Sequence, residues 1–249
     1  RQKEAFNMKT TVIYEPRGRA REYSALAANL YSGCNHGCKY CYAPACLRRD
    51  RESFYKNPAK RKNIIEQLTK DCQELEGKCE ERILLCFTCD PYQELEQELR
   101  ITRAALELFH IYNLSFQVLT KAGTKAERDY DLYKPGDAFA TTLTFMDEKK
   151  SLYYEPNAAL PHDRIQAIKD AKAQGIETWV SFEPVLNTKE VFKLLDATHE
   201  YVDLYKVGKV SNFQTDEPVN WNRFGHEIVN KLEKLGKKYY IKKDLQKYM

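Results

Sequence analysis

The chain has 249 residues, of which 43% are hydrophobic and 31% are charged, and its formal net charge is +4. This composition is typical of folded globular proteins and excludes an intrinsically disordered chain. No apolar run approaches the roughly 20 residues that a membrane-spanning helix needs, and residues 1–10 lack the apolar core of a secretory signal, so we expect a cytoplasmic protein without membrane contact.

Six short apolar runs alternate with longer amphipathic stretches. The runs predict strands at 24–30, 82–87, 115–119, 138–144, 178–182 and 202–207. The amphipathic stretches predict helices at 59–75, 94–111, 125–132, 162–174, 189–197 and 220–235. Strands that alternate with helices pair in parallel through right-handed crossovers. We therefore expect an α/β fold, either a partial (β/α)6 barrel of the TIM type or an open doubly wound sheet, with the chemistry at the carboxyl ends of the strands.

Neither an internal repeat nor a Gly/Ser-rich linker divides the sequence, and chains of this length often form one domain. We expect residues 1–249 to be a single domain. Its core would lie at about 22–209, with an N-terminal extension at 1–21 and a basic helical segment at 210–249.

All eight cysteines lie within the first 89 residues. Secreted disulfide-rich proteins are usually short and spread their cysteines through the chain, so this clustering favours metal ligation or thiol chemistry. Cys34, Cys38 and Cys41 follow the first predicted strand with the spacing C-x3-C-x2-C. Three thiolates leave one iron of a four-iron cubane open, which is typical of a catalytic metal site. The same cysteines could instead hold zinc, with His36 or another cysteine as the fourth ligand.

The cysteine motif, with Tyr40 directly before its third cysteine, resembles the signature of the radical S-adenosylmethionine (SAM) superfamily. The wider stretch from Pro16 to Cys38 resembles the spore photoproduct lyase-like (DNA repair photolyase-like) branch, and the resemblance continues to about Lys209. It implies a barrel of the radical SAM type, a [4Fe–4S] cluster on the three cysteines, and SAM at the open iron, with Tyr40 among the cofactor-binding residues. It also implies reductive cleavage of SAM to a 5′-deoxyadenosyl radical that abstracts hydrogen from a substrate.

Polar residues stand where the next predicted strands end. After the second strand, Thr88 and Asp90 would accept hydrogen bonds from the SAM amino group, although Asp90 could also cap the helix near residue 94. The resemblance implies that Lys121, after the third strand, faces the SAM carboxylate. Thr142 in the fourth strand would contact the carboxylate or ribose. Downstream, Arg164 would be a further partner for the carboxylate.

Cys86 and Cys89 form a C-x2-C pair at the end of the second strand. The photoproduct lyases place a cysteine in this region that returns a hydrogen atom to the product radical. When the two are aligned on Asp90, Phe87 takes the donor position, with Cys86 beside it and Cys89 two places further on. Both thiols are therefore predicted catalytic residues, while the departure from the pattern weakens the assignment of the lyase reaction itself.

Two further charged residues fall in the last predicted strands. Glu183 follows the fifth strand and Lys206 lies in the sixth. They either point into the barrel or form a buried ion pair with each other.

Two stretches, 48–62 and 231–247, are rich in Lys and Arg. Basic patches with interleaved aromatic side chains suit a phosphate backbone and stacked bases, although a solvated helix face would have the same composition. We therefore expect action on DNA or RNA through these stretches, in repair or modification like that of the photoproduct lyases, with a DNA lesion flipped out of the stack. The chemistry would also need an electron donor such as flavodoxin or ferredoxin.

Two alternatives stay open. A radical SAM enzyme could instead act on RNA, a peptide or a small molecule. A zinc-bearing, non-catalytic nucleic-acid-binding module would use the same cysteines and the same basic stretches.

Overall fold

The computed structural model describes residues 10–211, 213–215 and 217–249. Its main sheet has eight strands in the order β1-β2-β5-β6-β7-β8-β9-β10, and every neighbouring pair is parallel except β1 with β2. The strands of this sheet are β1 (Ile13–Tyr14), β2 (Leu26–Ala28), β5 (Ile83–Leu85), β6 (Phe116–Thr120), β7 (Ala138–Thr142), β8 (Glu177–Val185), β9 (Leu204–Lys209) and β10 (Lys238–Ile241). Each of the six predicted strands overlaps one of them, which confirms the α/β class.

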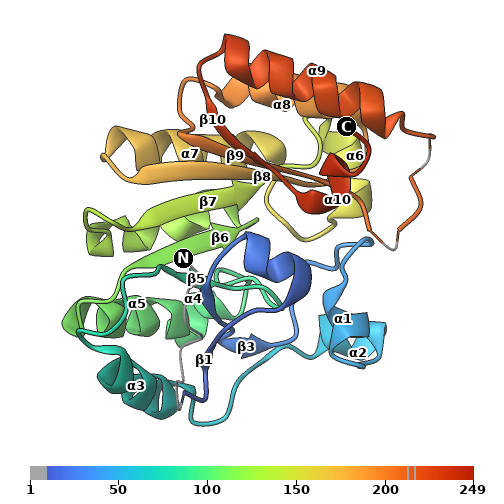
Figure 1. Cartoon of the computed structure of the whole chain (residues 1–249). Coiled ribbons are helices and arrows are strands. Elements are labelled where there is room, and N and C mark those ends of the chain that lie inside the picture. The colour runs from blue at the N-terminus through green and yellow to red at the C-terminus, as the bar shows by residue number, and fades with distance from the viewer. Residues whose placement is uncertain (1–9, 212, 216) are drawn as a thin grey trace.

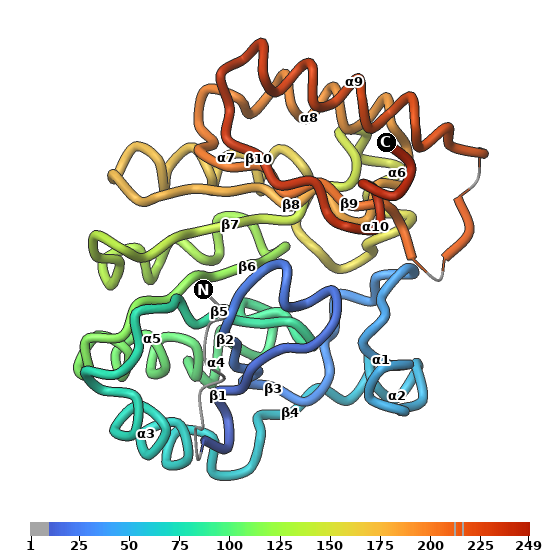
Figure 2. Tube along the Cα trace, viewed as in Figure 1, coloured from blue at the N-terminus to red at the C-terminus, as the bar shows by residue number. Residues whose placement is uncertain are grey.

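The larger helices cover the sheet on one side (Figures 1 and 2). They are α3 (Ile64–Leu75), α5 (Ile101–Ile111), the 3-10 segment η2 (Gly123–Leu132), α7 (Pro161–Ala173), α8 (Thr188–Thr198) and α9 (Trp221–Lys234). The shorter helical segments are η1 (Gly18–Glu22), α1 (Ala43–Cys46), α2 (Arg51–Lys56), α4 (Glu96–Leu99), α6 (Glu148–Tyr154) and α10 (Lys243–Gln246). Of these, α1, α2, α6 and α10 lie toward one end of the strands (Figure 1). Among the described residues, no helix is long and apolar enough to span a membrane.

Local side-chain chemistry fixes where several helices begin. The Asn187 side chain accepts a hydrogen bond from the Lys189 backbone at 3.0 Å at the start of α8. Asn220 does the same for the Arg223 backbone at the start of α9, also at 3.0 Å. Because such caps satisfy backbone N–H groups that the helix leaves unpaired, they stabilise the predicted starts.

Three segments differ from the sequence-based expectations. The helix predicted at 94–111 is divided into α4 and α5 by Arg100, whose φ of 51° is left-handed. The helix predicted from residue 59 begins only at Ile64, because β4 (Ala59–Lys60) pairs with β3 (Tyr31–Ser32) in a separate two-stranded sheet. The segment 210–249 contains not only helices but also β10, which extends the main sheet beside β9.

Large aromatic side chains fill the core beneath the strands. Trp179, Phe139, Phe182 and Tyr205 are fully buried, and the rings of Phe182 and Tyr205 stack at 5.3 Å. Burying one such side chain stabilises the fold by about 1.5–3 kcal/mol. This packing holds the parallel strands together, so that the loops after their carboxyl ends share one edge of the sheet.

Candidate functional site

A cavity of about 490 Å³ lies at the carboxyl ends of the strands. Its wall contains every site residue predicted from the sequence except Arg164. These residues are Cys34, Cys38, Tyr40, Cys41, Cys86, Thr88, Cys89, Asp90, Lys121 and Thr142. Segments far apart in the sequence therefore contribute to a single site.

The three motif cysteines lie in the loop 33–42, here called the cysteine loop, which follows β3. Gly33 has a φ of 92°, and a Cβ atom there would lie 2.7 Å from the Phe54 carbonyl oxygen, so no other residue fits without strain. The Cys34 backbone donates to that same oxygen at 3.2 Å. From α2, the Tyr55 hydroxyl donates to the Cys38 carbonyl oxygen at 2.8 Å. These contacts hold the loop in one conformation.

Burial keeps the thiols of Cys34 and Cys38 protonated when no metal is bound to them. It raises the pKa of Cys38 to about 12 and that of Cys34 well above its ordinary value, although a hydrogen bond from the His36 backbone partly offsets the shift at Cys34. A coordinated metal reverses this effect, because it binds the thiolate. Among the described residues, no three His, Cys, Asp or Glu side chains converge on a single metal ion. A cubane cluster does not need such convergence, since each thiolate binds a different iron.

Asp90 lines the cavity, but its carboxylate is already occupied by protein donors. One oxygen accepts from the Thr120 hydroxyl at 2.7 Å and from the Tyr92 backbone at 2.9 Å. The other accepts from the Lys121 backbone at 2.8 Å and lies 3.5 Å from Nδ1 of His36. Asp90 does not cap α4, which has no side-chain cap. It joins the loop after β5 to the end of β6.

Thr88 is held through its backbone. The backbone N–H groups of Phe87 and Thr88 both donate to the Asn29 side-chain oxygen, at 2.8 and 2.9 Å. This contact fixes the segment after β5 against the end of β2, and Thr88 stays half-exposed in the cavity wall.

Lys121 is a cation whose ammonium group has no hydrogen-bond acceptor among the residues that the structure describes. The Tyr40 ring lies near its ammonium group, with the ring centroid 5.9 Å from Nζ. Burial alone would lower the pKa of Lys121, but the negative charge that Cys38 carries as a thiolate and that of the Glu155 carboxylate outweigh it, so the pKa lies above its ordinary value. The ammonium group therefore stays charged and is free to pair with an anionic ligand in the cavity.

Arg164 lies behind the cavity wall. It is fully buried, with Nη2 2.7 Å from Glu155, and it donates to the Thr142 carbonyl oxygen at 3.0 Å. Glu155 in turn accepts from the Tyr40 hydroxyl. Burial alone would raise the pKa of Glu155, but Arg164 and Lys121 lower it below its ordinary value. Through Glu155, Arg164 positions Tyr40 in the cysteine loop, and it also fixes the end of β7.

Cys86 and Cys89 are both buried in the cavity wall and are both free thiols. Burial raises the pKa of Cys86 well above its ordinary value, and a hydrogen bond with the Cys89 thiol raises it further. Cys46 also lines the cavity, so six of the eight cysteines share it. The Cys86 thiol is thus protonated and in contact with Cys89.

A second group of polar residues, of which the sequence indicated only Glu183 and Lys206, lies in and behind the cavity wall. The Tyr23 hydroxyl donates to Glu183 at 2.5 Å and lies 2.6 Å from the Ser181 hydroxyl. Glu183 forms an ion pair at 2.7 Å with Lys242, not with Lys206. Lys206 instead donates to the Tyr23 carbonyl oxygen, and burial together with nearby Lys242 lowers its pKa to about 8.

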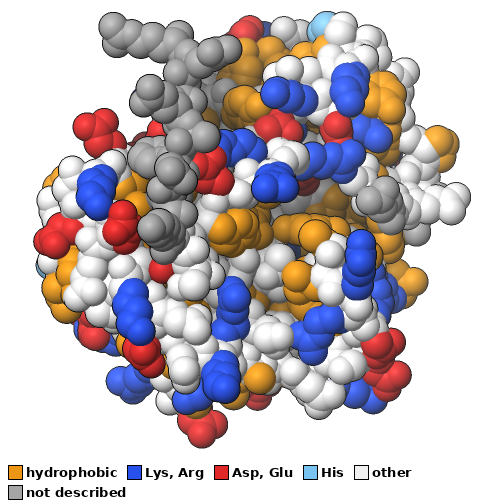
Figure 3. Space-filling view, turned by 60° about the horizontal axis from the view of Figure 1, so that its bottom comes forward, with side chains coloured by type: hydrophobic (Ala, Val, Ile, Leu, Met, Phe, Trp, Pro, Cys, Tyr) orange, Lys and Arg blue, Asp and Glu red, His pale blue; other side chains and the backbone are white. Residues whose placement is uncertain are grey.

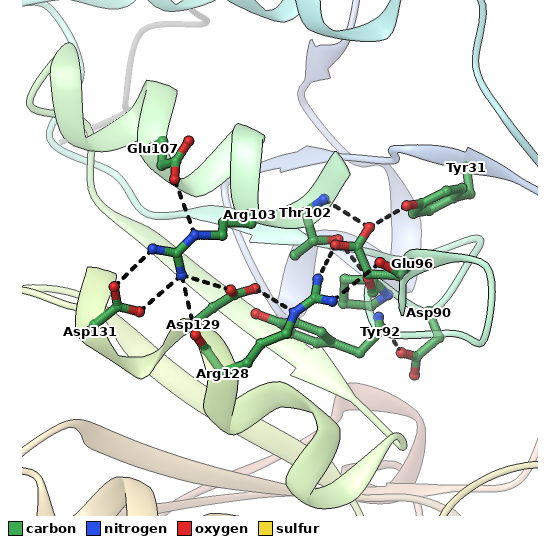
Figure 4. Close-up of polar contacts among 11 residues, drawn as sticks. Tyr31, Asp90, Tyr92, Glu96, Thr102, Arg103, Glu107, Arg128, Asp129 and Asp131 are labelled. Atoms are coloured by element: carbon green, nitrogen blue, oxygen red, sulfur yellow. Dashed lines mark hydrogen bonds and ion pairs between the residues drawn. The ribbon is translucent and has the colours of Figure 1, made fainter. Parts of the chain in front are cut away.

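A largely buried ionic network surrounds the carboxylate of Glu96 (Figure 4). Glu96, only 1% exposed, accepts from the Tyr31 hydroxyl, from the Arg128 guanidinium and from the Thr102 backbone at 2.9 Å. Arg128 also lies 3.4 Å from Asp129. Tyr31 lies in β3, which the cysteine loop follows, and Arg128 lies in η2, which follows β6 and Lys121. The network therefore links the segment before the cysteine loop to the segment after Lys121.

Residues 28–202 match the family described as the radical SAM superfamily, which covers well over half of the chain. The chain belongs to the radical SAM superfamily. Membership of this superfamily implies that the cofactors are a [4Fe–4S] cluster and SAM. The prediction of the family and its cofactors is confirmed, and the alternative of a zinc-bearing, non-catalytic module is wrong.

The curated proteins that this radical SAM enzyme resembles are described as uncharacterized. An uncharacterized protein of Methanocaldococcus jannaschii is 25% identical over 180 residues, which cover 71% of this chain and 67% of that one. The chain spans from 48% to 67% of the length of the curated relatives it matches.

Solved structures share the fold at low identity. A variant of spore photoproduct lyase with bound SAM and dinucleoside spore photoproduct has a TM-score of 0.72 at 12% identity, over 90% of this chain and 78% of that one. SuiB of Streptococcus suis bound to SAM has a TM-score of 0.67 at 10% identity, over 87% and 50%. SuiB bound to the precursor peptide SuiA has a TM-score of 0.51 at 11% identity, over 65% and 37%. These similarities confirm the partial barrel of the radical SAM type.

Proposed function

We propose that this protein is a radical SAM enzyme in which Cys34, Cys38 and Cys41 hold the cluster. The observation that carries the proposal is that these cysteines share one cavity with Lys121, a cation that has no protein acceptor among the described residues. A cluster with one open iron binds the amino and carboxylate groups of SAM. A free ammonium beside the three thiols supplies the positive charge that the SAM carboxylate needs.

The remaining predicted residues take different roles around SAM. Thr88 and Thr142, both in the cavity wall, would contact the cofactor directly. Asp90 would act mainly by fixing Thr120 and the Lys121 backbone, because three protein donors already occupy its carboxylate. Tyr40 and Arg164 are positioning residues, since Glu155 joins them behind the wall.

Cys86 and Cys89 would end the reaction by returning a hydrogen atom to the product radical. An S–H bond breaks, a C–H bond forms on the product, and the sulfur keeps the unpaired electron. Support for this role comes from their position in the cavity wall and from burial, which keeps the Cys86 thiol protonated.

The proposed substrate is nucleic acid. Arg17 and Arg19 line the cavity, and Lys242 lies in its far wall. Figure 3 shows a hollow whose wall is largely hydrophobic. Lys and Arg side chains lie on both sides of this hollow. Cationic rims of this kind attract phosphate groups, and the fold is that of a lyase solved with a dinucleoside photoproduct.

The basic stretch 231–247 offers less free charge than its sequence suggests. Lys231 is paired with Asp196, and Lys242 is buried against Glu183. Lys237 donates to a backbone carbonyl oxygen. Arg19 is also paired, with Asp244, so the proposed contact with nucleic acid rests mainly on Arg17.

A peptide substrate is the second possibility, because SuiB shares the fold and was solved with a precursor peptide. A binding measurement distinguishes a nucleic-acid substrate from a peptide substrate. The reconstituted protein should bind single- or double-stranded DNA or RNA at low salt, with an affinity that falls steeply as salt rises. Arg17→Gln with Arg19→Gln should weaken binding about tenfold and reduce the salt dependence. Absence of binding to all four nucleic acids at low salt would refute the nucleic-acid substrate and leave the radical SAM assignment untouched.

A further inference from the structure

A positively charged surface covers the outside of the cysteine loop. Between residues 39 and 62 the chain has eight Lys and Arg residues but only two acidic ones, Asp50 and Glu52. We call the solvent-facing part of this segment the outer basic surface. It consists of Lys39, Arg48, Arg49, Arg51, Lys56, Lys60 and Lys62, all of which are exposed or half-exposed.

This surface is separate from the cavity but touches the cysteine loop directly. None of residues 47–62 lines the cavity. The Arg51 guanidinium donates to the backbone carbonyl oxygens of Lys39 at 3.2 Å and of Cys41 at 2.8 Å. The Tyr55 hydroxyl donates to that of Cys38 at 2.8 Å. The backbone of two proposed ligands, Cys38 and Cys41, thus accepts hydrogen bonds from this segment, including from Arg51 of the outer basic surface.

The positive charge of the surface is largely uncompensated. Arg49 donates to the Ser32 hydroxyl, and Lys39 lies 3.1 Å from the centroid of the Tyr153 ring. Carbonyls, hydroxyls and rings carry no net negative charge. Within residues 39–62, all of which the structure describes, the ion pair of Lys56 with Glu52 is the one that forms. A surface of this kind attracts an acidic partner over a distance.

We propose that the outer basic surface is the docking site of an acidic one-electron redox protein of the flavodoxin or ferredoxin class. This inference rests on the proposed cluster ligands. The reduced partner loses one electron through the cysteine loop to the cluster, which gains it, and no bond in this chain forms or breaks. Nucleic acid fits the surface less well, because a nucleotide must reach the cavity, whose own cations are Arg17, Arg19, Lys121 and Lys242. We therefore assign residues 48–62 to an acidic redox protein, whereas the sequence predicted that they contact DNA or RNA.

The test compares two variants of the reconstituted protein that lose the same charge. One is Arg48→Gln with Lys60→Gln and Lys62→Gln on the outer basic surface. The matched control is Lys125→Gln with Lys189→Gln and Lys234→Gln, three exposed lysines outside both the surface and the cavity. For each variant we would measure the dissociation constant for an acidic flavodoxin and the rate at which reduced flavodoxin bleaches the cluster absorbance. Reduction by dithionite, which needs no docking surface, is followed in parallel.

The surface variant should bind flavodoxin about tenfold more weakly and be reduced by it about tenfold more slowly at low salt, and the difference should vanish at high salt. Dithionite should reduce both variants at the wild-type rate. Equal effects in the surface and control variants, or unchanged flavodoxin kinetics, would overturn the proposal. Loss of nucleic-acid binding with unchanged flavodoxin kinetics would assign the surface to nucleic acid. If wild-type protein had no cluster that dithionite could reduce, the proposed ligands would be wrong instead.

Discussion

Among single residues, Lys121 differs from the other cations of the site because its ammonium group has no ion pair or hydrogen-bond acceptor among the described residues. Arg164 is bound to Glu155, and Lys242 is bound to Glu183. An ammonium group in a cavity needs an anionic partner or water to offset its desolvation. We infer that the SAM carboxylate is that partner.

Replacing Lys121 with Met should weaken SAM binding. Loss of a charge-assisted hydrogen bond costs about 2 kcal/mol, which raises the Kd roughly 30-fold. Equilibrium dialysis with the reconstituted protein measures this, with Lys125→Met as the control on an exposed lysine outside the cavity. Because the pKa of Lys121 lies above its ordinary value of 10.5, the wild-type Kd should not change with the protonation of this residue between pH 7 and about 9. Unchanged affinity in the variant would contradict the assignment.

Glu155 is predicted to be essential for stability. In Glu155→Gln, Arg164 stays buried without a counter-charge, which should cost about 3–5 kcal/mol in the free energy of unfolding measured with urea. Glu148→Gln breaks only an exposed pair with His162 and should cost less than about 1 kcal/mol. The folded-state pKa of Glu155 lies below its ordinary value of 4.5. Its contribution should therefore be complete above that value and be lost as the pH falls through the folded-state pKa. An equal loss of unfolding free energy in the two variants would contradict the view that the buried Glu155–Arg164 pair stabilises the fold more than an exposed pair does.

The sequence predicted which residue types gather in the site, but not how they share contacts. The cysteine spacing and the polar residues at the strand ends were enough to place Cys34, Lys121 and Thr142 at one edge of the sheet. That Arg164 lies behind the wall, and that the Asp90 carboxylate is fully bonded, depends on distances between strands far apart in the chain. No local pattern encodes those distances.

Among the elements, β3, α4 and η2 are tied together by one carboxylate. Glu96 in α4 accepts from Tyr31 of β3 and from Arg128 of η2 (Figure 4). The network fixes the position of the start of the cysteine loop relative to the end of β6, which Lys121 directly follows.

Arg128→Met should therefore destabilise the protein by about 3 kcal/mol, because Glu96 would keep a buried charge without its cation. Chemical denaturation measures the effect. Lys56→Met removes an exposed pair within one helix and should change stability by no more than about 0.5 kcal/mol. If Arg128→Met unfolded at the same urea concentration as Lys56→Met, the network would not support the loop as described.

Element types could be predicted more readily than their ends. The six parallel strands and their helices follow from the alternation of apolar and amphipathic segments. The division of the helix at Arg100 could not be predicted, since a left-handed arginine has no sequence signature. Strand β10, with the sequence Lys-Tyr-Tyr-Ile, is hidden in a lysine-rich stretch, and only its pairing with β9 reveals it.

At the scale of the whole molecule, the cysteine loop lies between the cavity and the outer basic surface. The cavity, with Lys121 and the Cys86–Cys89 pair, lies on one side. On the other side is the outer basic surface, which contacts the loop through Arg51 and Tyr55. We infer that substrate would approach the cysteine loop through the cavity and that the electron donor would approach it through the outer basic surface.

The most direct test of the central claim is the formation of 5′-deoxyadenosine from SAM by anaerobically reconstituted, dithionite-reduced protein. The wild type should form it, and Cys38→Ala should lose both the cluster absorbance and the product. Cys79→Ser, at a cysteine outside the cavity, should retain both. If Cys38→Ala still formed 5′-deoxyadenosine at the wild-type rate, or if the wild type formed none, the assignment of Cys34, Cys38 and Cys41 as the ligands of the cluster would be contradicted.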